Sequence, residues 1–565
     1  MKDLTSLKKT SIALAVTHAL VINVSLAATI TVNNGGDSNA GCTLREAVTS
    51  VNQGSAIGGC SATGTFGVDD TINFSVAGVS GLSEQILISE DLSINPNGQA
   101  ISIQGTNTNR IFEVESRTDV SFSNVTIQGG RARNTGENTY DGGGAIFVGF
   151  GSDIEITNST IDGNFSEYSG GAIHTSNVVS LAITNSTISN NSTDIVNYGG
   201  GGGAIYLAGS SDLSITNSTI SDNTAGNAGG IYVATGSTVS IINSTIANNT
   251  ADNEASDFLG QGGGMRLTNT DLTISNSIVS GNTASGNVGG GLSINFRSSA
   301  NITNSTITNN TGRDGGGLAL NGAEVTLNST TISNNSAQED GGGVSAFASG
   351  STTFTSNISF INSTVSGNTA SENGGAIFIN PTNGFNLTAS IINSTISGNT
   401  ASQSGGGLSA GESTISLVNS LFSGNSANNS GSEISLLGGS PSLSGVNLFG
   451  DSSISNGQAF SSFTPGPNDI TATSDGSQPT ALANILSPLS NNGGNTQTHA
   501  LVDDSPAVDA ANNSICAASP INNRDQRGEI RPGGATCDIG SFEIVDPTSF
   551  FVVPLPNGRS VIFGL

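Results

Sequence analysis

The feature that most constrains this chain is an internal repeat that occupies residues from about 120 to about 430. One half of the unit reads I-T-N-S-T-I-S-x-N, and the other half reads G-G-G-A-I-Y-L. The unit is about 29 residues long, the mean spacing of its first asparagine between Asn158 and Asn419. Its β-branched residues are flanked by Asn, Ser and Thr, and no helical apolar period is present. Such a unit holds three short strands and three turns, which indicates one coil of a β-helix rather than a four-stranded propeller blade.

The composition agrees with a solenoid. Aromatic residues make up 5% of the chain and tryptophan is absent, whereas hydrophobic residues make up 35%. A solenoid needs little aromatic mass because each coil buries only a thin slice of core against its neighbours. We therefore predict an all-β protein, a right-handed parallel β-helix of about ten to eleven coils with a cap at each end.

The first asparagine of the unit recurs at one register. Stacked amides carry both a donor and an acceptor, so they can bond to each other and to the turn backbone. The predicted structural ladder consists of Asn158, Asn185, Asn217, Asn243, Asn276, Asn304, Asn362, Asn393 and Asn419. The alternative is that these N-S-T triplets are glycan acceptors. Their regular recurrence, below a bacterial-looking export signal, favours the ladder.

Spacing separates a nearly constant path from a variable one. The path from the Gly-rich half to the next asparagine is nearly fixed, whereas the return path tolerates insertions, as a loop does. The longest insertions are Ser192–Gly201, Ala251–Gln261 and Ala346–Ser356, and we expect the first two to lie along one edge of the rod. Tyr198, Phe258 and Leu259 give these two loops apolar tips and are candidate ligand-binding residues. The alternative is neutral variation in loop sequence.

Residues 1–27 are expected to form an export signal. Lys2, Lys8 and Lys9 precede an apolar stretch, and Ser25-Leu26-Ala27 predicts cleavage before Ala28. The alternative is a retained anchor, although the stretch is short for a membrane helix.

Cleavage would remove every lysine and leave 12 arginines and 41 acidic residues, a net charge of −29. Nucleic acid and anionic membranes would repel such a chain. We expect no cofactor, although weak calcium binding by acidic turns is possible.

Four cysteines remain after cleavage, as two local pairs near the chain ends. Three pairings are possible, and we favour Cys42 with Cys60 and Cys516 with Cys537, one disulfide in each cap. A zinc site is not expected, because the chain has no C-x-x-C motif and few histidines.

Both halves of the repeat resemble right-handed β-helix proteins of the pectate-lyase-like superfamily and the repeats of chlamydial polymorphic outer membrane proteins. The stretch from Cys42 to Ala47, CTLREA, closely resembles the signature of CSLREA-domain proteins, and 69–74 continues the resemblance. The motifs at 492–501, 505–509, 525–528 and 537–540 resemble the choice-of-anchor C-terminal domain of the same proteins. This resemblance implies a secreted or surface-attached protein whose biochemical role is usually unassigned.

The resulting division of the chain has five parts. They are a signal peptide (1–27), a CSLREA-like cap with the first coils (28–110), the repeats (111–430), a choice-of-anchor-like domain (431–545) and a short apolar tail (546–565). That tail is too short to cross a membrane as a helix, so the mature chain is predicted to have no transmembrane span.

A carbohydrate-active enzyme is the strongest competing class, because pectate-lyase-like folds often carry lyases and hydrolases. Asp314 and Asp340 precede the Gly runs of neighbouring coils, and Arg266 follows such a run, so these are the candidate catalytic residues. The simpler interpretation is that both aspartates are solvated turn residues, and that His174 is a surface residue. Fold alone does not confer chemistry.

We therefore expect an exported, adhesin-like protein, located outside the cell or on a bacterial outer membrane, that binds an extracellular glycan or protein. A purely structural surface protein is a further alternative.

Overall fold

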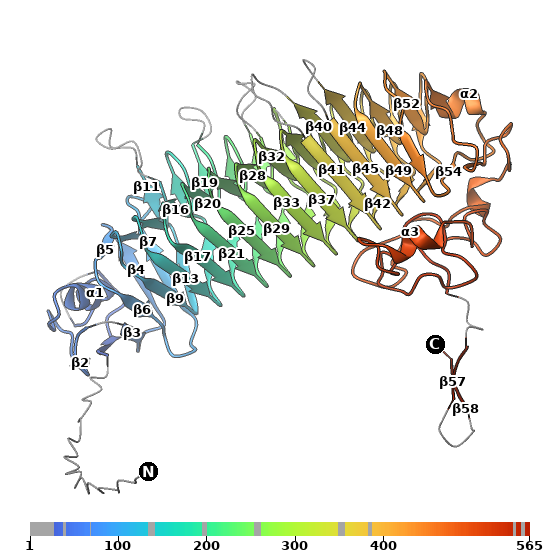
Figure 1. The fold of residues 1–565 in the computed structure, drawn as a ribbon. Helices are drawn as coiled ribbons and strands as arrows, with labels where there is room; N and C mark the ends of the chain where they lie inside the picture. Colours follow the sequence, from blue (N-terminus) through green and yellow to red (C-terminus); the bar gives the residue numbers. More distant parts are fainter. Residues whose placement is uncertain are drawn as a thin grey trace, which may run out of the picture.

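The computed structural model describes residues 27–37, 41–67, 69–133, 142–194, 200–252, 261–286, 288–348, 356–381, 387–545, 550–554 and 560–564. The chain winds into a rod in which like strands of successive coils lie side by side (Figure 1). This arrangement is a parallel β-helix, as the repeat predicts. No helix within these ranges is long and apolar enough to cross a bilayer.

Each full coil contributes one strand to each of four sheets, which we number 1 to 4 in the order that the chain visits them. The sequence predicts three strands a coil, so the fourth was missed. The missed strands form sheet 3. Each is a two-residue segment at the corner after the Ser-x-Asn turn, and it is too short to show any apolar period in the sequence.

Sheet 1 holds, in order, β2 (Ala62–Thr63), β1 (Thr29–Val32), β3 (Asp70–Phe74), β6 (Leu92–Ile94), β9 (Val120–Ser123), β13 (Asp153–Thr157), β17 (Ser180–Thr184), β21 (Asp212–Thr216), β25 (Thr238–Ile242), β29 (Asp271–Ser275), β33 (Ser299–Thr303), β37 (Glu324–Asn328), β41 (Ser356–Ile361), β45 (Leu387–Ile392), β49 (Thr414–Val418) and β53 (Ser442–Ser444). Sheet 2 holds β4 (Gly78–Leu82), β7 (Ile101–Gly105), β10 (Val125–Gln128), β14 (Thr160–Asp162), β18 (Thr187–Ser189), β22 (Thr219–Ser221), β26 (Thr245–Ala247), β30 (Ile278–Ser280), β34 (Thr306–Thr308), β38 (Thr331–Ser333), β42 (Thr364–Ser366), β46 (Thr395–Ser397), β50 (Leu421–Ser423), β54 (Leu448–Phe449) and β56 (Ile470–Thr471).

Sheet 3 holds β11 (Arg131–Ala132), β15 (Phe165–Ser166), β19 (Ser192–Thr193), β23 (Thr224–Ala225), β27 (Thr250–Ala251), β31 (Thr283–Ala284), β35 (Thr311–Gly312), β39 (Ser336–Ala337), β43 (Thr369–Ala370), β47 (Thr400–Ala401) and β51 (Ser426–Ala427). Sheet 4 holds β5 (Ile86–Ile88), β8 (Phe112–Val114), β12 (Ile146–Val148), β16 (Ile173–Ser176), β20 (Ile205–Ala208), β24 (Ile231–Val233), β28 (Met265–Thr268), β32 (Leu292–Asn295), β36 (Leu318–Asn321), β40 (Val344–Ala348), β44 (Ile377–Pro381), β48 (Leu408–Ala410), β52 (Ile434–Leu436) and β55 (Phe460–Ser461). Two further strands, β57 (Phe550–Pro554) and β58 (Ser560–Gly564), pair antiparallel.

The helix is longer than the predicted ten to eleven coils. Over the described ranges sheet 1 contains 16 strands and sheet 4 contains 14, so the stack of coils begins at β1 and continues beyond residue 430. The extra coils lack the Asn and Gly signature, but their alternating apolar residues still stack. Counting the signature alone therefore gave too few coils.

The core consists of aliphatic columns. Ile154 and Ile156 of β13 lie in register with Leu181 and Ile183 of β17, and all four side chains are buried. Parallel, in-register stacking repeats this contact at about 4.8 Å per coil, so like residues meet like residues throughout the rod.

The asparagine column predicted from the sequence is in register but does not form an amide ladder. These nine residues adopt left-handed backbone angles, with φ between 45° and 51°, at the turn from sheet 1 to sheet 2. Asn is tolerated there because its side chain is short and polar. Asn158, Asn185, Asn217, Asn243 and Asn276 are exposed and Asn304 is half-buried, whereas Asn362, Asn393 and Asn419 are buried beneath the C-terminal part of the chain.

The amide ladder is formed by the second asparagine of the unit, six residues later, at the turn from sheet 2 to sheet 3. Each Nδ2 donates to Oδ1 of the equivalent residue in the next coil, over 2.9–3.0 Å. Its members, all buried, are Asn164, Asn191, Asn223, Asn249, Asn282, Asn310, Asn335, Asn368, Asn399 and Asn425. The run ends at Glu433, whose Oε2 accepts from Asn425 Nδ2 at 2.6 Å. The prediction chose the wrong asparagine because a left-handed turn directs the first side chain outward.

Each end of the rod carries a cap with a disulfide. Helix α1 (Leu44–Asn52) starts at Thr43, whose side chain and Glu46 form a capping box, and the Cys42–Cys60 disulfide adjoins this helix. At the other end lie α2 (Asn456–Ala459), a short 3₁₀ helix (Leu482–Asn484) and α3 (Asn513–Ala517), with the Cys516–Cys537 disulfide. These bonds are the two local pairs that the sequence favours.

Residues 485–545 fold back beside the final coils, and we refer to them as the C-terminal module (Figure 1). It docks on the outward hydroxyls of sheet 2. Thr331 Oγ1 donates to the Gln497 carbonyl, Thr364 Oγ1 to Gln526 Oε1, and Ser366 Oγ bonds with His499 Nε2. The same hydroxyl pattern that is half-buried in earlier coils is here fully buried.

Candidate functional site

Two adjoining grooves lie where the chain passes from sheet 4 into sheet 1. The corner groove has a volume of about 500 Å³ and runs across the turns before β13, β17, β21 and β25; its lining includes Phe150, Asn177, Val179, Ser210 and Asp212. The sheet-1 groove, of about 420 Å³, lies on the outer face of β6, β9, β13 and β17. Together they form one surface that can be reached from solvent.

The corner groove owes its shape to apolar residues in turns. Phe150 is 53% exposed and Val179 is 56% exposed, and both stand in turns that line the groove. Asn177 holds a left-handed turn between them with φ of 52°, and Gly209 of the next coil leaves room for the Asn177 amide, because a Cβ there would collide with it. Exposed apolar side chains fixed on a rigid backbone are typical of recognition surfaces.

The sheet-1 groove is acidic. Asp119 N–H donates to Asp91 Oδ1 at 2.9 Å, and Asp153 N–H donates to Asp119 Oδ1 at 2.9 Å, so the carboxylates of successive coils form a column. Ser180 Oγ continues the column by donating to Asp153 Oδ1. Glu155 lies exposed in the same groove. The two grooves thus combine apolar faces with carboxylate and hydroxyl groups, the pairing that suits the C–H faces and hydroxyls of a sugar.

Sequence reasoning missed this surface. It placed the binding edge at the insertions that carry Tyr198, Phe258 and Leu259, and these three residues lie outside the described residues. The available signal was the run Gly149-Phe150-Gly151 and the pair Val178-Val179, which put large apolar residues where most other coils have small or polar turn residues.

A second outward feature is a stack of rings on sheet 4. Phe147, His174, Tyr206 and Tyr232 occupy one register, with ring centroids 4.9–5.6 Å apart and interplanar angles of 15–22°. Arg110 covers Phe147 at 5.0 Å, and the Arg266 guanidinium lies 5.2 Å from the Tyr232 centroid. The ring faces are therefore occupied by one another, which leaves only edges for a ligand.

His174 is buried, not at the surface as the sequence suggested. Burial and the nearby Arg110 charge lower its pKa to about 3, so the imidazole is neutral. The backbone of Ser169, beside the ring, opposes part of this shift. The Gly-rich turn contributes to the burial, because a Cβ at Gly142 would collide with His174 Nδ1, so only glycine lets the backbone pass this close to the ring.

The candidate catalytic residues are only partly brought together. Asp314 and Asp340 are neighbours on adjacent coils, and Asp340 N–H donates to Asp314 Oδ1 at 3.3 Å. Burial raises the pKa of Asp340, while hydrogen bonds from Asn373 oppose the shift. Arg266 pairs with Ser293 and then Ala319, so it lies two coils from Asp314, about 10 Å along the rod. None of the three lines either groove.

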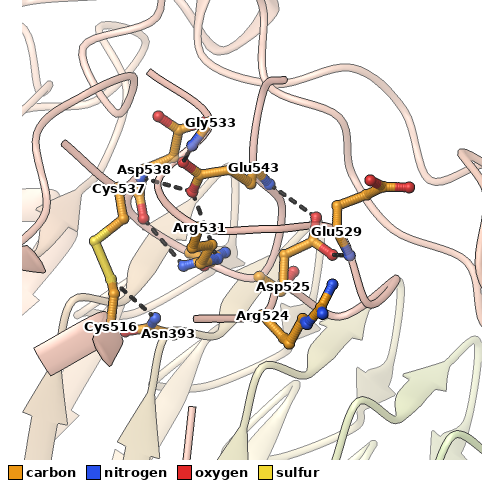
Figure 2. Close-up of polar contacts among 12 residues, drawn as sticks. Asn393, Cys516, Arg524, Asp525, Glu529, Arg531, Gly533, Cys537, Asp538 and Glu543 are labelled. Atoms are coloured by element: carbon orange, nitrogen blue, oxygen red, sulfur yellow. Dashed lines mark hydrogen bonds and ion pairs between the residues drawn. A yellow bond between two sulfur atoms is a disulfide. The ribbon is translucent and has the colours of Figure 1, made fainter. Parts of the chain in front are cut away.

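A group of buried charges lies inside the C-terminal module (Figure 2). Arg531 is fully buried; its Nη2 donates to the Gly540 carbonyl at 2.6 Å, and its Nε lies 3.5 Å from Glu543 Oε2. Glu543 also accepts the N–H groups of Gly533 and Asp538. Burial raises the pKa of Glu543 to about 7 and that of Asp538 to about 6, although Arg531 opposes both shifts.

This cluster holds the module together and is not an active site. Its groups bond to backbone atoms of the module, and they are almost fully buried, so no substrate can reach them. Within the described ranges, no group of three or more His, Cys, Asp or Glu side chains is placed to hold a metal ion.

The comparisons agree with this geometry. A family model described as the right handed beta helix region matches residues 87–286 and 198–393, which together span more than half of the chain. The chain belongs to the right-handed β-helix family. Its coils are thus right-handed, as parallel crossover connections nearly always are.

Other comparisons add little to this assignment. The crystal structure of pectate lyase Pel9A is 11% identical and is covered over 96% of its length by 91% of this chain, with a TM-score of 0.35. Similarity at this level carries no conclusion about activity. No curated protein sequence matches the chain. Membership of the β-helix family establishes the scaffold but not the function, because a fold alone does not confer chemistry.

Proposed function

We propose that this β-helix protein is exported and acts as an adhesin-like binder, holding a glycan along the corner and sheet-1 grooves without chemical turnover. The observation that carries the proposal is the exposed Phe150 and Val179 beside the column of Asp119, Asp153 and Ser180. Apolar side chains can pack on the C–H face of a sugar, while carboxylates and hydroxyls accept and donate hydrogen bonds to its hydroxyl groups.

The charge of the surface narrows the ligand class. The mature chain would carry a net charge of −29, and the sheet-1 groove adds a local run of carboxylates. Acidic polysaccharides would be repelled by this field, so neutral or amino-sugar glycans fit better.

Binding to an array of neutral, amino and acidic glycans, with analysis of any released products, tests the proposal. We expect Phe150→Ala to weaken binding of the best glycan about tenfold, and Asp153→Asn to weaken it by a similar factor. Leu437→Ala is the matched control, because Leu437 is 78% exposed at the far end of the rod. Binding that is unchanged in Phe150→Ala, or lost equally in Leu437→Ala, would contradict the proposal.

A carbohydrate-active enzyme is the second candidate, favoured by the contact between Asp314 and Asp340 and by the raised pKa of Asp340. Release of reducing or unsaturated sugar ends that disappears in Asp340→Asn would establish this alternative. A protein that neither binds nor cleaves any glycan would instead be a structural surface component.

A further inference from the structure

Asp70 at the start of β3 is a buried carboxylate without a cationic partner. Its side chain is 1% exposed, Oδ1 accepts the backbone N–H of Ala28 at 2.8 Å, and Oδ2 accepts that of Gly67 at 3.3 Å. Across the described ranges, no Arg or His side chain forms an ion pair with it. A buried carboxylate normally pairs with a positive charge, because two neutral N–H groups replace its lost hydration only in part.

The residue that Asp70 contacts is the one that the export signal singles out. Cleavage after Ala27 would make Ala28 the first residue of the mature protein. Ala28 is fully buried, and its carbonyl accepts the N–H of Thr71, so its position in the first coil is fixed from both sides. The sequence rule for cleavage and the position of the carboxylate are independent observations.

We propose that maturation places the new α-ammonium group of Ala28 against Asp70, forming a buried ion pair that fastens β1 to the first coil. A signal peptidase and one water molecule hydrolyse the Ala27–Ala28 peptide bond, which leaves a carboxylate on Ala27 and an amine on Ala28; the amine takes up a proton. The ammonium keeps the hydrogen bond to Asp70 Oδ1 and adds a full positive charge to it. Cleavage also removes the bridge between Ala27 and Thr65.

The sequence makes this ion pair unusually easy to probe. Lys2, Lys8 and Lys9 are the only lysines of the chain, so the α-amine of the mature protein is its sole primary amine. An N-hydroxysuccinimide ester therefore labels one position, and intact mass measures both the labelled fraction and the first residue. The matched control is the same protein with Gly-Ser placed before Ala28, which moves the amine out of the coil.

We expect the folded mature protein to be labelled on the order of 100-fold more slowly than the extended control, because the amine reacts only when β1 opens. Both should be labelled at the same rate in denaturant. Equal rates in the folded proteins, or a mature chain that begins at another residue, would overturn the proposal.

Substitution of the carboxylate supplies a second measurement. Asp70→Asn should lower the thermal midpoint of the mature protein by about 5 °C and that of the extended protein by clearly less, since only the mature form loses an ion pair. Asp69→Asn removes the same charge from the adjacent, exposed side chain and should change neither midpoint. An equal loss in both forms would show that Asp70 serves only as a hydrogen-bond acceptor and would refute the ion pair. If Asp70→Asn does not fold, the labelling rates of the unsubstituted proteins decide.

Discussion

The coils of the β-helix and the C-terminal module solve the same problem in different ways. Both must satisfy buried polar groups. The coils do so with neutral amides and hydroxyls that repeat at every turn, such as the ladder from Asn164 to Asn425 and the stacked Ser186 and Ser218. The module, which lacks a repeat, uses charged groups that each occur once, with Arg531 bound to Glu543 and Arg527 to Asp525.

The difference teaches how each region fixes its shape. Each ladder asparagine donates a hydrogen bond to the equivalent asparagine of the next coil and accepts one from that of the previous coil. Stacking the coils therefore satisfies every side chain of the ladder except those at its ends. An irregular segment cannot use translation, and strong charge-assisted bonds to particular backbone atoms take its place. We therefore expect the coils to respond mainly to loss of an amide and the module to respond mainly to loss of a charge.

The largest effect is expected from breaking the amide ladder at its middle. Asn310→Ala would leave the backbone N–H of Asn282 without its acceptor and would remove the hydrogen bond between the two ladder amides. It would also remove the hydrogen bonds that Asn310 Nδ2 donates to the Val279 carbonyl and to Asn335 Oδ1. A buried N–H left unpaired costs about 1–3 kcal/mol and each further lost hydrogen bond about 1 kcal/mol, so we expect a loss of about 4 kcal/mol in the free energy of unfolding, measured by denaturant titration. A loss below about 1 kcal/mol would show that the ladder contributes little.

The next largest effect is expected in the module. Arg531→Met would leave Glu543 and Asp538 buried without their cation, costing about 3 kcal/mol at pH 8. At pH 5 the cost should be smaller, because both carboxyl groups are then largely protonated, given folded pKa values of about 7 and 6. Thermal unfolding of the variant and the unchanged protein at both pH values measures the difference. A cost independent of pH would contradict the charged state assigned to this cluster.

Asp538 and Glu543 of the module and His174 of the coils should respond to pH with opposite signs. In the module, the raised pKa values of Asp538 and Glu543 favour the fold fully below about pH 4, and this contribution is lost as the pH rises through 6 and 7. In the coils, the lowered pKa of His174 gives a contribution that is present above about 6.5 and lost as the pH falls toward 3.

His174→Phe isolates the coil response. We expect the unchanged protein to lose about 2 kcal/mol of stability between pH 7 and pH 5 relative to this variant, whose ring keeps the stack with Phe147 and Tyr206. Denaturant titrations at several pH values measure the two slopes. His499 is unchanged in the variant and also has a lowered pKa, so part of the acid sensitivity remains. Parallel slopes for the two proteins would show that His174 accepts a proton in the folded state.

The smallest effect is expected at the first asparagine of the repeat. Asn304→Ala should cost about 1 kcal/mol, because alanine tolerates its φ of 49° less well, whereas Asn304→Gly should be nearly neutral. Comparison with Asn310→Ala in the same assay tests which of the two asparagines carries the ladder. A larger loss at Asn304 than at Asn310 would restore the assignment made from the sequence.

The repeat made the fold predictable, since alternating Ile and Val with Gly and Asn turns permit few structures other than stacked strands. The right ladder was also within reach of the sequence. The first asparagine column is interrupted at Ser329, whereas the second continues there as Asn335. The candidate site was not predictable in the same way, because Phe150, Val179 and Asp119 stand in different coils and acquire a common surface only by stacking.

The sequence by itself determined the coil and its repeat length and favoured the local pairing of its cysteines, since these depend on residues close together in the chain. The tertiary structure alone decided which hydroxyls of sheet 2 are covered by the C-terminal module and which carboxylate meets Ala28. Those contacts join Thr364 to Gln526 and Ala28 to Asp70. The two residues of each contact are distant in sequence. The number and register of the coils set how they lie relative to each other, and no local sequence pattern encodes that number or register.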